Sequence, residues 1–267
     1  MIEYGMNWRE GGISMPRMVR KMDRANYNHI ILRGISEVPV FSDDEDRQRF
    51  LDQLAECAGE YDIEVHAYCL MKDHIHLLIC VRNDCMSSFV QKLASRYVSY
   101  YNYKYSRRGS LFQGRFRHEP IRSPEYYLSV LRYIHRDPEN SNIGAVDSFK
   151  WSSYGEYEAG SKKTGSRIVV TGPALELLGG FENFCKFLAC EDDIIGMDVD
   201  NNSEESDERI AIFVSRCLNI KTPRAINGMS IKSRNMLIRE MRALGITASQ
   251  ISRLTGVSRS VIYKLEY

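Results

Sequence analysis

Two histidines separated by one residue are the first feature of the sequence that could do chemistry. His74 and His76 lie in an apolar run that is typical of a buried central strand. Because side chains alternate along a strand, both imidazoles should point to the same face, where they can bind one divalent metal ion. The alternative is two ordinary histidines with hydrogen-bond partners in the core or at the surface.

The segments around this pair predict alternating strands and helices. Composition favours strands at residues 26–33, 63–71, 74–81 and 115–121. The expected helices cover residues 42–59, 87–105 and 124–136. Ser42 and Glu45 match a capping box, Ser87 or Ser88 can cap the second helix, and Pro138 should end the third.

The order strand, helix, strand, strand, helix, strand, helix is typical of a split β-α-β arrangement. We therefore expect an α+β, ferredoxin-like domain with a mostly antiparallel sheet and its helices packed on one face. The expected divisions of the chain are an N-terminal arm at 1–25, the α+β domain at 26–157, a helical extension at 158–190, an acidic linker at 191–208 and a small all-α domain at 209–267.

The net charge of +1 hides an uneven distribution of charge. Residues 92–136 contain ten Lys and Arg but two acidic residues, and residues 209–267 contain eleven but two acidic residues. Residues 191–208 contain nine acidic residues and no basic one. The two basic segments indicate two nucleic-acid surfaces, with ordinary solvated helix faces as the alternative.

The last sixty residues predict a helix-turn-helix. Helices are expected at 232–244, 248–254 and 259–265, with Thr247 and Ser258 as caps and Gly256 in the turn. The expected inward face consists of Ile251, Leu254, Val257, Val261, Ile262 and Leu265. The last helix would present Arg259 and Lys264 to duplex DNA. A three-helix module that binds another protein is the alternative.

Composition points to a cytoplasmic protein without a membrane partner. No apolar run approaches the ~20 residues of a membrane span, and the N-terminus lacks the basic-then-apolar order of a secretory signal. The seven cysteines match no common zinc spacing, so we expect reduced, mostly buried thiols.

Four further segments resemble motifs of a known family. Residues 67–78 read AYCLMKDHIHLL, residues 109–116 read GSLFQGRF, residues 131–138 read LRYIHRDP and residues 151–154 read WSSY, while Arg33-Gly34 ends the first strand. In this order and spacing, over residues 26–157, they resemble the HUH single-tyrosine transposases. The REP-associated tyrosine transposase branch is the closer match.

The resemblance implies a metal-dependent transposase that cuts single-stranded DNA. Tyr133 aligns with the family's nucleophile, which forms a 5′-phosphotyrosine and leaves a free 3′-OH. His74 and His76 would hold Mg²⁺ or Mn²⁺, and imidazole favours Mn²⁺. The family's third ligand is an amide four residues after the tyrosine. This chain has Asp137 there, which we expect to be a ligand rather than a plain residue at a helix end.

The implied partners are hairpin-bearing single-stranded DNA at the first domain and duplex DNA at the C-terminal domain; a homodimer is compatible with both. The candidate DNA contacts are Arg33, Lys104, Arg107, Arg108, Arg115, Arg117, Arg259 and Lys264. Three other residues of the same basic segment, Leu93, Tyr97 and Tyr101, are spaced four residues apart. This helical spacing predicts that they form a buried stripe rather than DNA contacts.

Several positions depart from the family pattern or compete with it. The family usually has Pro-Asn before the histidines, whereas this chain has lysine and Asp73, an outer partner of the metal site or a turn residue. We expect His135 at the surface or on DNA rather than on the metal. Tyr126 and Tyr127 are rival nucleophiles, but the register of the motif favours Tyr133.

Two other functions agree less well with the sequence. A non-catalytic regulator that represses through the helix-turn-helix has no reason to keep His74, His76 and Tyr133 together. A replication or conjugation nicking enzyme would use related chemistry, but no helicase or primase segment follows the domain.

Overall fold

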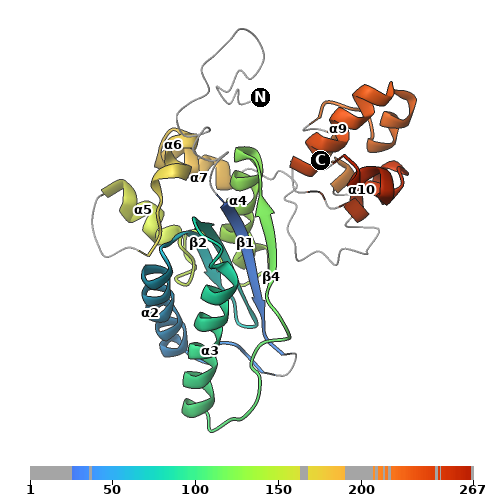
Figure 1. The fold of residues 1–267 in the computed structure, drawn as a ribbon. Coiled ribbons are helices and arrows are strands. Elements are labelled where there is room, and N and C mark those ends of the chain that lie inside the picture. The colour runs from blue at the N-terminus through green and yellow to red at the C-terminus, as the bar shows by residue number, and fades with distance from the viewer. Residues whose placement is uncertain are drawn as a thin grey trace.

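The computed structural model describes residues 26–35, 38–162, 168–189, 207, 210–212, 214–215, 218–243, 246 and 248–265. Buried side chains in these residues form two hydrophobic clusters, one ending at Leu188 and the other running from Ile210 to Ile262. The helices and strands that carry them are drawn as a ribbon in Figure 1, blue to yellow for the first cluster and orange to red for the second. The expected N-terminal arm lies outside the described residues, and so does the expected acidic linker apart from Asp207.

A four-stranded antiparallel sheet forms the centre of the first cluster. Its strands are β1 (Asn26–Arg33), β2 (Ile63–Leu70), β3 (His74–Val81) and β4 (Arg117–Ile121), in the order β2-β3-β1-β4. This order and the sequence of elements confirm the predicted α+β, ferredoxin-like fold. All eight residues of β3 are buried, because β3 lies between two strands and both of its faces are covered.

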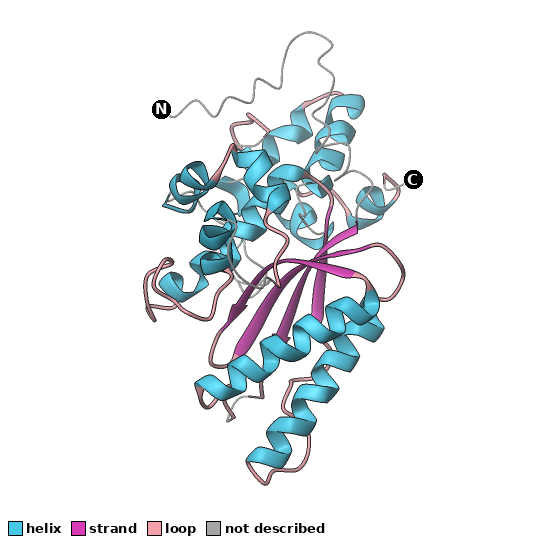
Figure 2. Ribbon diagram, turned by 90° about the vertical axis from the view of Figure 1, so that its left-hand side faces the viewer, coloured by secondary structure: helices cyan, strands magenta, loops and turns pink. Residues whose placement is uncertain are grey.

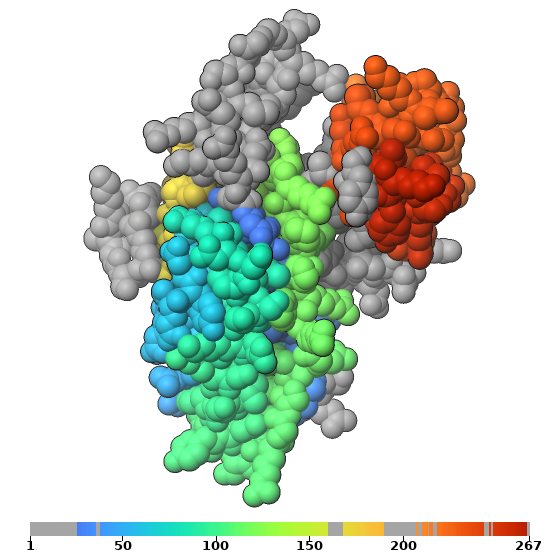
Figure 3. All heavy atoms as spheres, viewed as in Figure 1, coloured from blue at the N-terminus to red at the C-terminus, as the bar shows by residue number. Residues whose placement is uncertain are grey.

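Helices cover both faces of the sheet, which corrects the expectation of one covered face. Helices α2 (Asp44–Tyr61) and α3 (Met86–Lys104) pack on each other and on one face (Figure 2), and their outward surfaces lie side by side in Figure 3. Helix α4 (Pro124–Asn140) packs on the other face, where its Tyr133 ring contacts His29 and His76. Alternation turns these histidines away from α2 and α3, so a second layer is needed to bury them.

The N-terminus of α2 differs from the predicted capping box by one residue. Asp43 is the N-cap, and its carboxylate accepts a hydrogen bond from Asp46 N at 2.9 Å, while Asp46 accepts from Asp43 N at 3.3 Å. Ser42 instead uses its hydroxyl to hydrogen bond with Tyr101 at 2.9 Å. The prediction of a capping box with Ser42 and Glu45 was therefore wrong, because the serine hydroxyl hydrogen bonds with a tyrosine that is distant in the sequence.

The start of α3 and the end of α4 also differ from the sequence prediction. Cys85 is the N-cap of α3 without a side-chain hydrogen bond, so the predicted serine caps were wrong. Ser123 caps α4, and that helix continues through Pro138 to Asn140 instead of stopping before the proline. The proline ring has a helical φ, and the next bond is kept, with Ser141 N donating to Asp137 O at 2.9 Å. Tyr133 and Asp137 consequently share one continuous helix.

Three shorter helices extend the first cluster. They are α5 (Tyr154–Lys162), α6 (Gly172–Leu178) and α7 (Phe181–Ala189). Phe184, Phe187 and Leu188 of α7 are buried in the same core as the sheet, and α7 packs on α4. The predicted helical extension therefore packs against the domain that holds the histidines, and it begins inside α5.

The second cluster consists of η1 (Pro223–Gly228), α9 (Ile231–Ala243), α10 (Ala248–Thr255) and α11 (Arg259–Tyr263). Ile251, Leu254, Val257 and Ile262 are buried as predicted. Gly256 lies between α10 and α11 with a φ of +80°, which glycine adopts without strain. The other two predicted inward residues, Val261 and Leu265, are half-buried against the same cluster, and the last helix ends at Tyr263 rather than at residue 265. Ser258 is the N-cap of α11 without a side-chain hydrogen bond, and Thr247 lies outside the described residues.

No helix in the described part of the chain is long and apolar enough to cross a membrane. Five cysteines fall in this part, and all are free thiols. Cys57, Cys69 and Cys80 are buried, and Cys85 and Cys185 are half-buried. For these five, the prediction of reduced, mostly buried thiols is confirmed.

Candidate active site

Strand β3 carries the two histidines at its first and third positions. His74 is paired across the sheet with Arg33, and His76 with Ile31. His76 is fully buried, whereas 9 % of His74 is exposed. Their rings lie 4.9 Å apart, so the alternation expected from the sequence places both imidazoles together under α4.

Asp137 of α4 reaches both histidines. Its Oδ2 lies 3.0 Å from His74 Nε2 and 3.7 Å from His76 Nε2, and one ligand atom from each of the three residues lies within 4.8 Å of the others. Cis ligands of a small divalent ion are about 3 Å apart. Two imidazole nitrogens and one carboxylate oxygen suit a first-row divalent ion such as Mn²⁺, and the carboxylate also suits Mg²⁺. The donor set therefore fits the ion expected from the sequence.

Each histidine is also held through its other ring nitrogen. His74 Nδ1 lies 2.8 Å from Asp73 Oδ1, and His76 Nδ1 lies 2.9 Å from His29 Nε2. Such outer partners select the tautomer and fix the ring orientation of a metal-ligating histidine. Of the two roles left open for Asp73, the geometry agrees with that of the outer partner.

A glycine allows the turn before β3 to approach β1. Gly34 N donates to Asp73 O at 2.7 Å. A Cβ on Gly34 would lie 2.7 Å from Val40 Cγ2 and 3.0 Å from Asp73 O, so any larger residue would push this turn away. The glycine that follows Arg33 in the sequence motif therefore helps to place Asp73 beside His74.

Tyr133 lies on α4 next to the three candidate ligands. Its ring centroid is 5.3 Å from that of His76 and 6.0 Å from that of His29, both in edge-on contact. It stands one helical turn before Asp137, and 9 % of it is exposed. The predicted nucleophile and the predicted ligands are thus brought together within one chain.

The two rival tyrosines of α4 are engaged elsewhere. Tyr126 hydrogen bonds with Glu119, and burial raises the pKa of Tyr126 well above its usual value. The Tyr127 hydroxyl lies 3.0 Å from His66 Nδ1 and is fully buried, which likewise raises its pKa. Both hydroxyls therefore remain protonated, and neither contacts the candidate metal ligands.

His135 corrects one expectation, since it is fully buried rather than at the surface or on DNA. Burial lowers its pKa to about 4, so the ring is neutral. Its Nδ1 donates to Leu131 O at 2.8 Å, and its Nε2 accepts from the Ser153 hydroxyl at 2.8 Å. Ser153 in turn accepts from Tyr68 N at 3.1 Å, so this part of the WSSY motif joins α4 to β2.

Two of the predicted DNA-binding arginines flank the histidines. Arg33 is directly opposite His74 in the sheet. Arg117, on the edge strand β4, is paired with Ile31, which separates it from His76. Paired residues share a face, so both side chains leave the sheet on the side of the metal ligands, with Arg117 about 10 Å from His76. Arg108 and Arg115 are exposed in the segment before β4.

Lys104 and Arg107 have partners within the protein. Lys104 Nζ lies 2.8 Å from Asp43 and 2.9 Å from both Glu45 and Asp46. Three carboxylates offset its charge and tie α3 to the start of α2. Arg107 lies over the Tyr101 ring at 5.8 Å. In the C-terminal cluster, the remaining two candidates, Arg259 and Lys264, are exposed.

His29 is the site residue that sequence reasoning missed. It is a buried histidine in a β-branched strand, and it contacts both His76 and Tyr133. The signal was present, because His29 lies in the predicted first strand. Its relevance depends on the register between β1 and β3, which places His29 diagonally across from His76.

We expect His29→Phe to weaken metal binding. Phenylalanine keeps the ring contact but removes the hydrogen bond to His76 Nδ1, and losing an outer partner typically costs 10–100-fold in metal affinity. Calorimetric titration of the metal-free protein with Mn²⁺ measures this. His118→Phe, at an exposed position on β4, is the matched control. An unchanged Mn²⁺ affinity in His29→Phe would count against this role.

Comparisons with known proteins place the sequence beside known transposases through one family model and one distant structure. No curated protein matches the chain. A solved structure described as "Structure of the REP associates tyrosine transposase bound to a REP hairpin" is similar at 14 % identity with a TM-score of 0.45, covering 64 % of this chain and 94 % of that one. Residues 23–137, which contain all the candidate catalytic residues, match the model of the family "Transposase IS200 like". This segment of the chain is therefore similar to the IS200-like transposases.

Proposed function

We propose that this chain is a transposase, a metal-dependent endonuclease and strand transferase that cuts single-stranded DNA near hairpins through a phosphotyrosine on Tyr133. One observation carries the proposal: His74, His76 and Asp137 offer ligand atoms within 4.8 Å of one another, and the Tyr133 ring lies against His76. A nucleophile next to a divalent-metal site is the arrangement that phosphodiester cleavage needs.

In the proposed reaction the Tyr133 hydroxyl oxygen attacks the scissile phosphorus. A bond forms between this oxygen and phosphorus, the bond from phosphorus to the 3′ oxygen breaks, and the phenolic proton is lost while the leaving 3′ oxygen gains one. The products are a 5′-phosphotyrosine and a free 3′-OH. Attack by the 3′-OH of another strand reverses these changes, so the phosphodiester is kept for rejoining and no external energy is required.

His74, His76 and Asp137 would hold Mg²⁺ or Mn²⁺. When bound, the ion polarises the scissile phosphate and stabilises negative charge on the leaving oxygen. The protein's own contribution is to orient the ligands, through Asp73 on one histidine and His29 on the other. The two imidazoles favour Mn²⁺ over Mg²⁺ on grounds of ligand hardness.

Arg33 and Arg117 are the best-placed residues for the substrate backbone. Both project on the sheet face of the metal ligands, and Arg108 and Arg115 extend the positive charge along the segment before β4. Phosphates of a single strand that enters the site would lie among these guanidinium groups. Lys104 is left out of this interface, because three carboxylates already neutralise it.

The direct test is capture of the covalent intermediate. The full chain is incubated with a labelled single-stranded oligonucleotide that contains a hairpin, and the products are separated on a denaturing gel. We expect a shifted protein–DNA band with Mn²⁺, none with a chelator, and a weaker band when the stem is scrambled. Absence of the band with Mn²⁺ across a set of hairpin sequences would contradict the proposed chemistry.

We further propose that the C-terminal cluster binds duplex DNA next to the cleavage site. Arg259 begins α11 and Lys264 follows it, both exposed, as expected for a helix that enters a major groove. Arg259→Ala with Lys264→Ala should lower duplex affinity at least about tenfold. The slope of log affinity against log salt concentration should become shallower by about two, one for each lost phosphate contact. Cleavage of a short hairpin strand should not change.

Fluorescence anisotropy at several salt concentrations measures the duplex affinity. Lys150→Ala is the control, because this exposed lysine lies outside the C-terminal helices and pairs with Asp44 at the start of α2. Equal duplex affinity in the double variant and the control would favour the alternative, a module that binds protein.

A further inference from the structure

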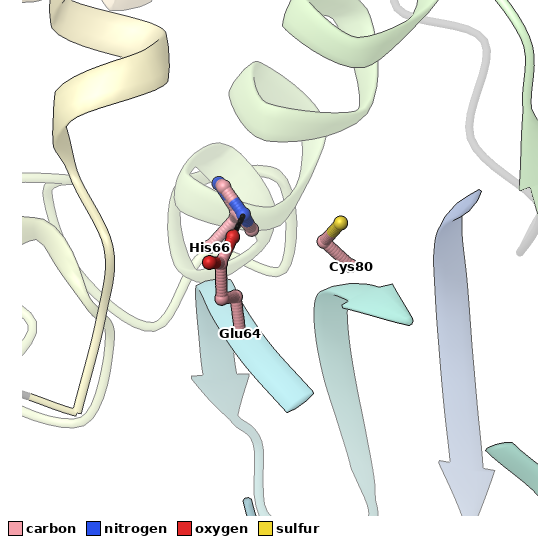
Figure 4. Close-up of side chains that lie close together, drawn as sticks. All are labelled: Glu64, His66 and Cys80. Atoms are coloured by element: carbon pink, nitrogen blue, oxygen red, sulfur yellow. Dashed lines mark ion pairs between the residues drawn. The ribbon is translucent and has the colours of Figure 1, made fainter. Parts of the chain in front are cut away.

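A second cluster of potential ligands lies at the opposite end of the sheet from the candidate active site. Glu64 and His66 on β2 and Cys80 on β3 offer one oxygen, one nitrogen and one sulfur atom within 4.8 Å of one another (Figure 4). Cys80 is six residues along β3 from His74, roughly 20 Å at the usual rise of a strand. The two clusters are therefore separate.

His66 is aimed into this cluster by an irregularity of the strand. The pairing of β2 with β3 shifts between Val65 and Ala67, so His66 is the extra residue of a β-bulge. Its Nδ1 lies 3.0 Å from the Tyr127 hydroxyl. Its Nε2 is buried and has no hydrogen-bond partner within the described residues, the nearest Glu64 oxygen being 3.6 Å away. A buried ring nitrogen without a hydrogen bond needs an explanation.

The chemistry of the three donors selects the ion. A thiolate, an imidazole and a carboxylate together suit Zn²⁺, whereas Mg²⁺ and Ca²⁺ prefer oxygen ligands alone. Around a tetrahedral zinc ion, neighbouring ligand atoms are about 3.3–3.6 Å apart, since the bonds are ~2.0–2.3 Å long. His66 Nε2 and the Glu64 oxygen already lie 3.6 Å apart, and no two of the three donors are more than 4.8 Å apart.

Both buried donors are uncharged in the metal-free protein. Burial lowers the pKa of His66 and raises that of Cys80 to about 11. Neutral His66 can ligate directly, and Cys80 would lose its proton to the ion on binding. With one thiolate and one carboxylate, a bound Zn²⁺ would be charge-neutral, which favours it in a buried place.

We propose that Glu64, His66 and Cys80 form a zinc site that is distinct from the active site. The fourth position would be taken by water on the side of Glu64, which is the least buried of the three. The ion would join β2 to β3 and, through the hydrogen bond of His66 with Tyr127, fix the helix that carries Tyr133. The role we assign to it is structural.

Cobalt titration tests the site with a readout that does not depend on activity. The full chain is stripped of metal under reducing conditions and titrated with Co²⁺ alone. We expect thiolate-to-cobalt charge-transfer absorption in the near ultraviolet, lost in Cys80→Ser. The band should persist in Cys57→Ser, which changes another buried thiol, and in the double variant His74→Ala with His76→Ala.

Three results would overturn the proposal: no thiolate band in the unchanged protein, a band that survives Cys80→Ser, or its loss in the double histidine variant. A second measurement covers the case in which Cys80→Ser fails to fold. In the double histidine background, Glu64→Gln should weaken zinc binding at least about tenfold in competition with a chromophoric chelator, because it removes a charged ligand at a partly exposed position. Equal zinc affinity would contradict the site.

Discussion

Tyr133→Phe is expected to abolish the covalent protein–DNA adduct and to lower cleavage by at least about 10³-fold. If Tyr133 is the nucleophile, as proposed, the variant keeps only the contributions of DNA binding and of the metal ion to the rate. In enzymes with covalent intermediates, loss of the nucleophile removes most of the rate enhancement. The substitution removes one oxygen and keeps the ring contacts with His76 and His29. Single-stranded DNA affinity and Mn²⁺ affinity should therefore remain within a few-fold of those of the unchanged protein.

Tyr126→Phe is the matched control, on the same helix and with the same chemical change. Its hydroxyl hydrogen bonds with Glu119 rather than lying beside the metal ligands. We expect this variant to form the adduct at close to the normal rate per folded molecule, with folding checked by thermal denaturation. An adduct that survives Tyr133→Phe and disappears in Tyr126→Phe would move the nucleophile to Tyr126.

The fold could be predicted from sequence because its signals are local and repeated. The alternation of apolar residues in each strand, and the order of strands and helices, allow few topologies, and the observed strand order is the one expected of a ferredoxin-like sheet. The helix ends were less predictable. Ser42 had the right type and spacing for a cap, but its hydroxyl hydrogen bonds with the hydroxyl of Tyr101, which lies on α3. No local pattern contains that contact.

The residues of the candidate site likewise fall into those that local sequence patterns predicted and those that depend on distant contacts. His74, His76, Tyr133 and Asp137 have local spacings, two and four residues, that place each pair on one face of its element. That the two pairs meet depends on packing of α4 over β3, which the family motifs implied and the 3.0 Å contact between His74 and Asp137 supports. His29 and His135 could not be assigned in this way. The role of each depends on one partner far along the chain, His76 and Ser153 respectively.

The second large effect is expected at Asp137, where this chain has a carboxylate in place of the family's amide. Asp137→Ala should weaken Mn²⁺ binding at least about 100-fold, because it removes the one charged donor of the three, and loss of even an outer partner costs about 10–100-fold in metal affinity. Cleavage at low Mn²⁺ should fall in proportion and recover as Mn²⁺ is raised. Asp137→Asn, which restores the family's ligand type, should keep the metal and lose no more than about tenfold in affinity.

Glu139→Ala separates ligation from a general effect of charge at this end of α4. Glu139 is two residues further along the same helix, exposed, and paired with Arg136 at 3.0 Å, so its carboxylate points away from the histidines. If Asp137 only stabilises the end of the helix, both alanine variants should change thermal stability and neither should change Mn²⁺ affinity. If Asp137 is a ligand, low Mn²⁺ should protect the unchanged protein and Glu139→Ala from heat, whereas Asp137→Ala should need about 100-fold more Mn²⁺ for the same protection, since only a bound ion shifts the unfolding equilibrium.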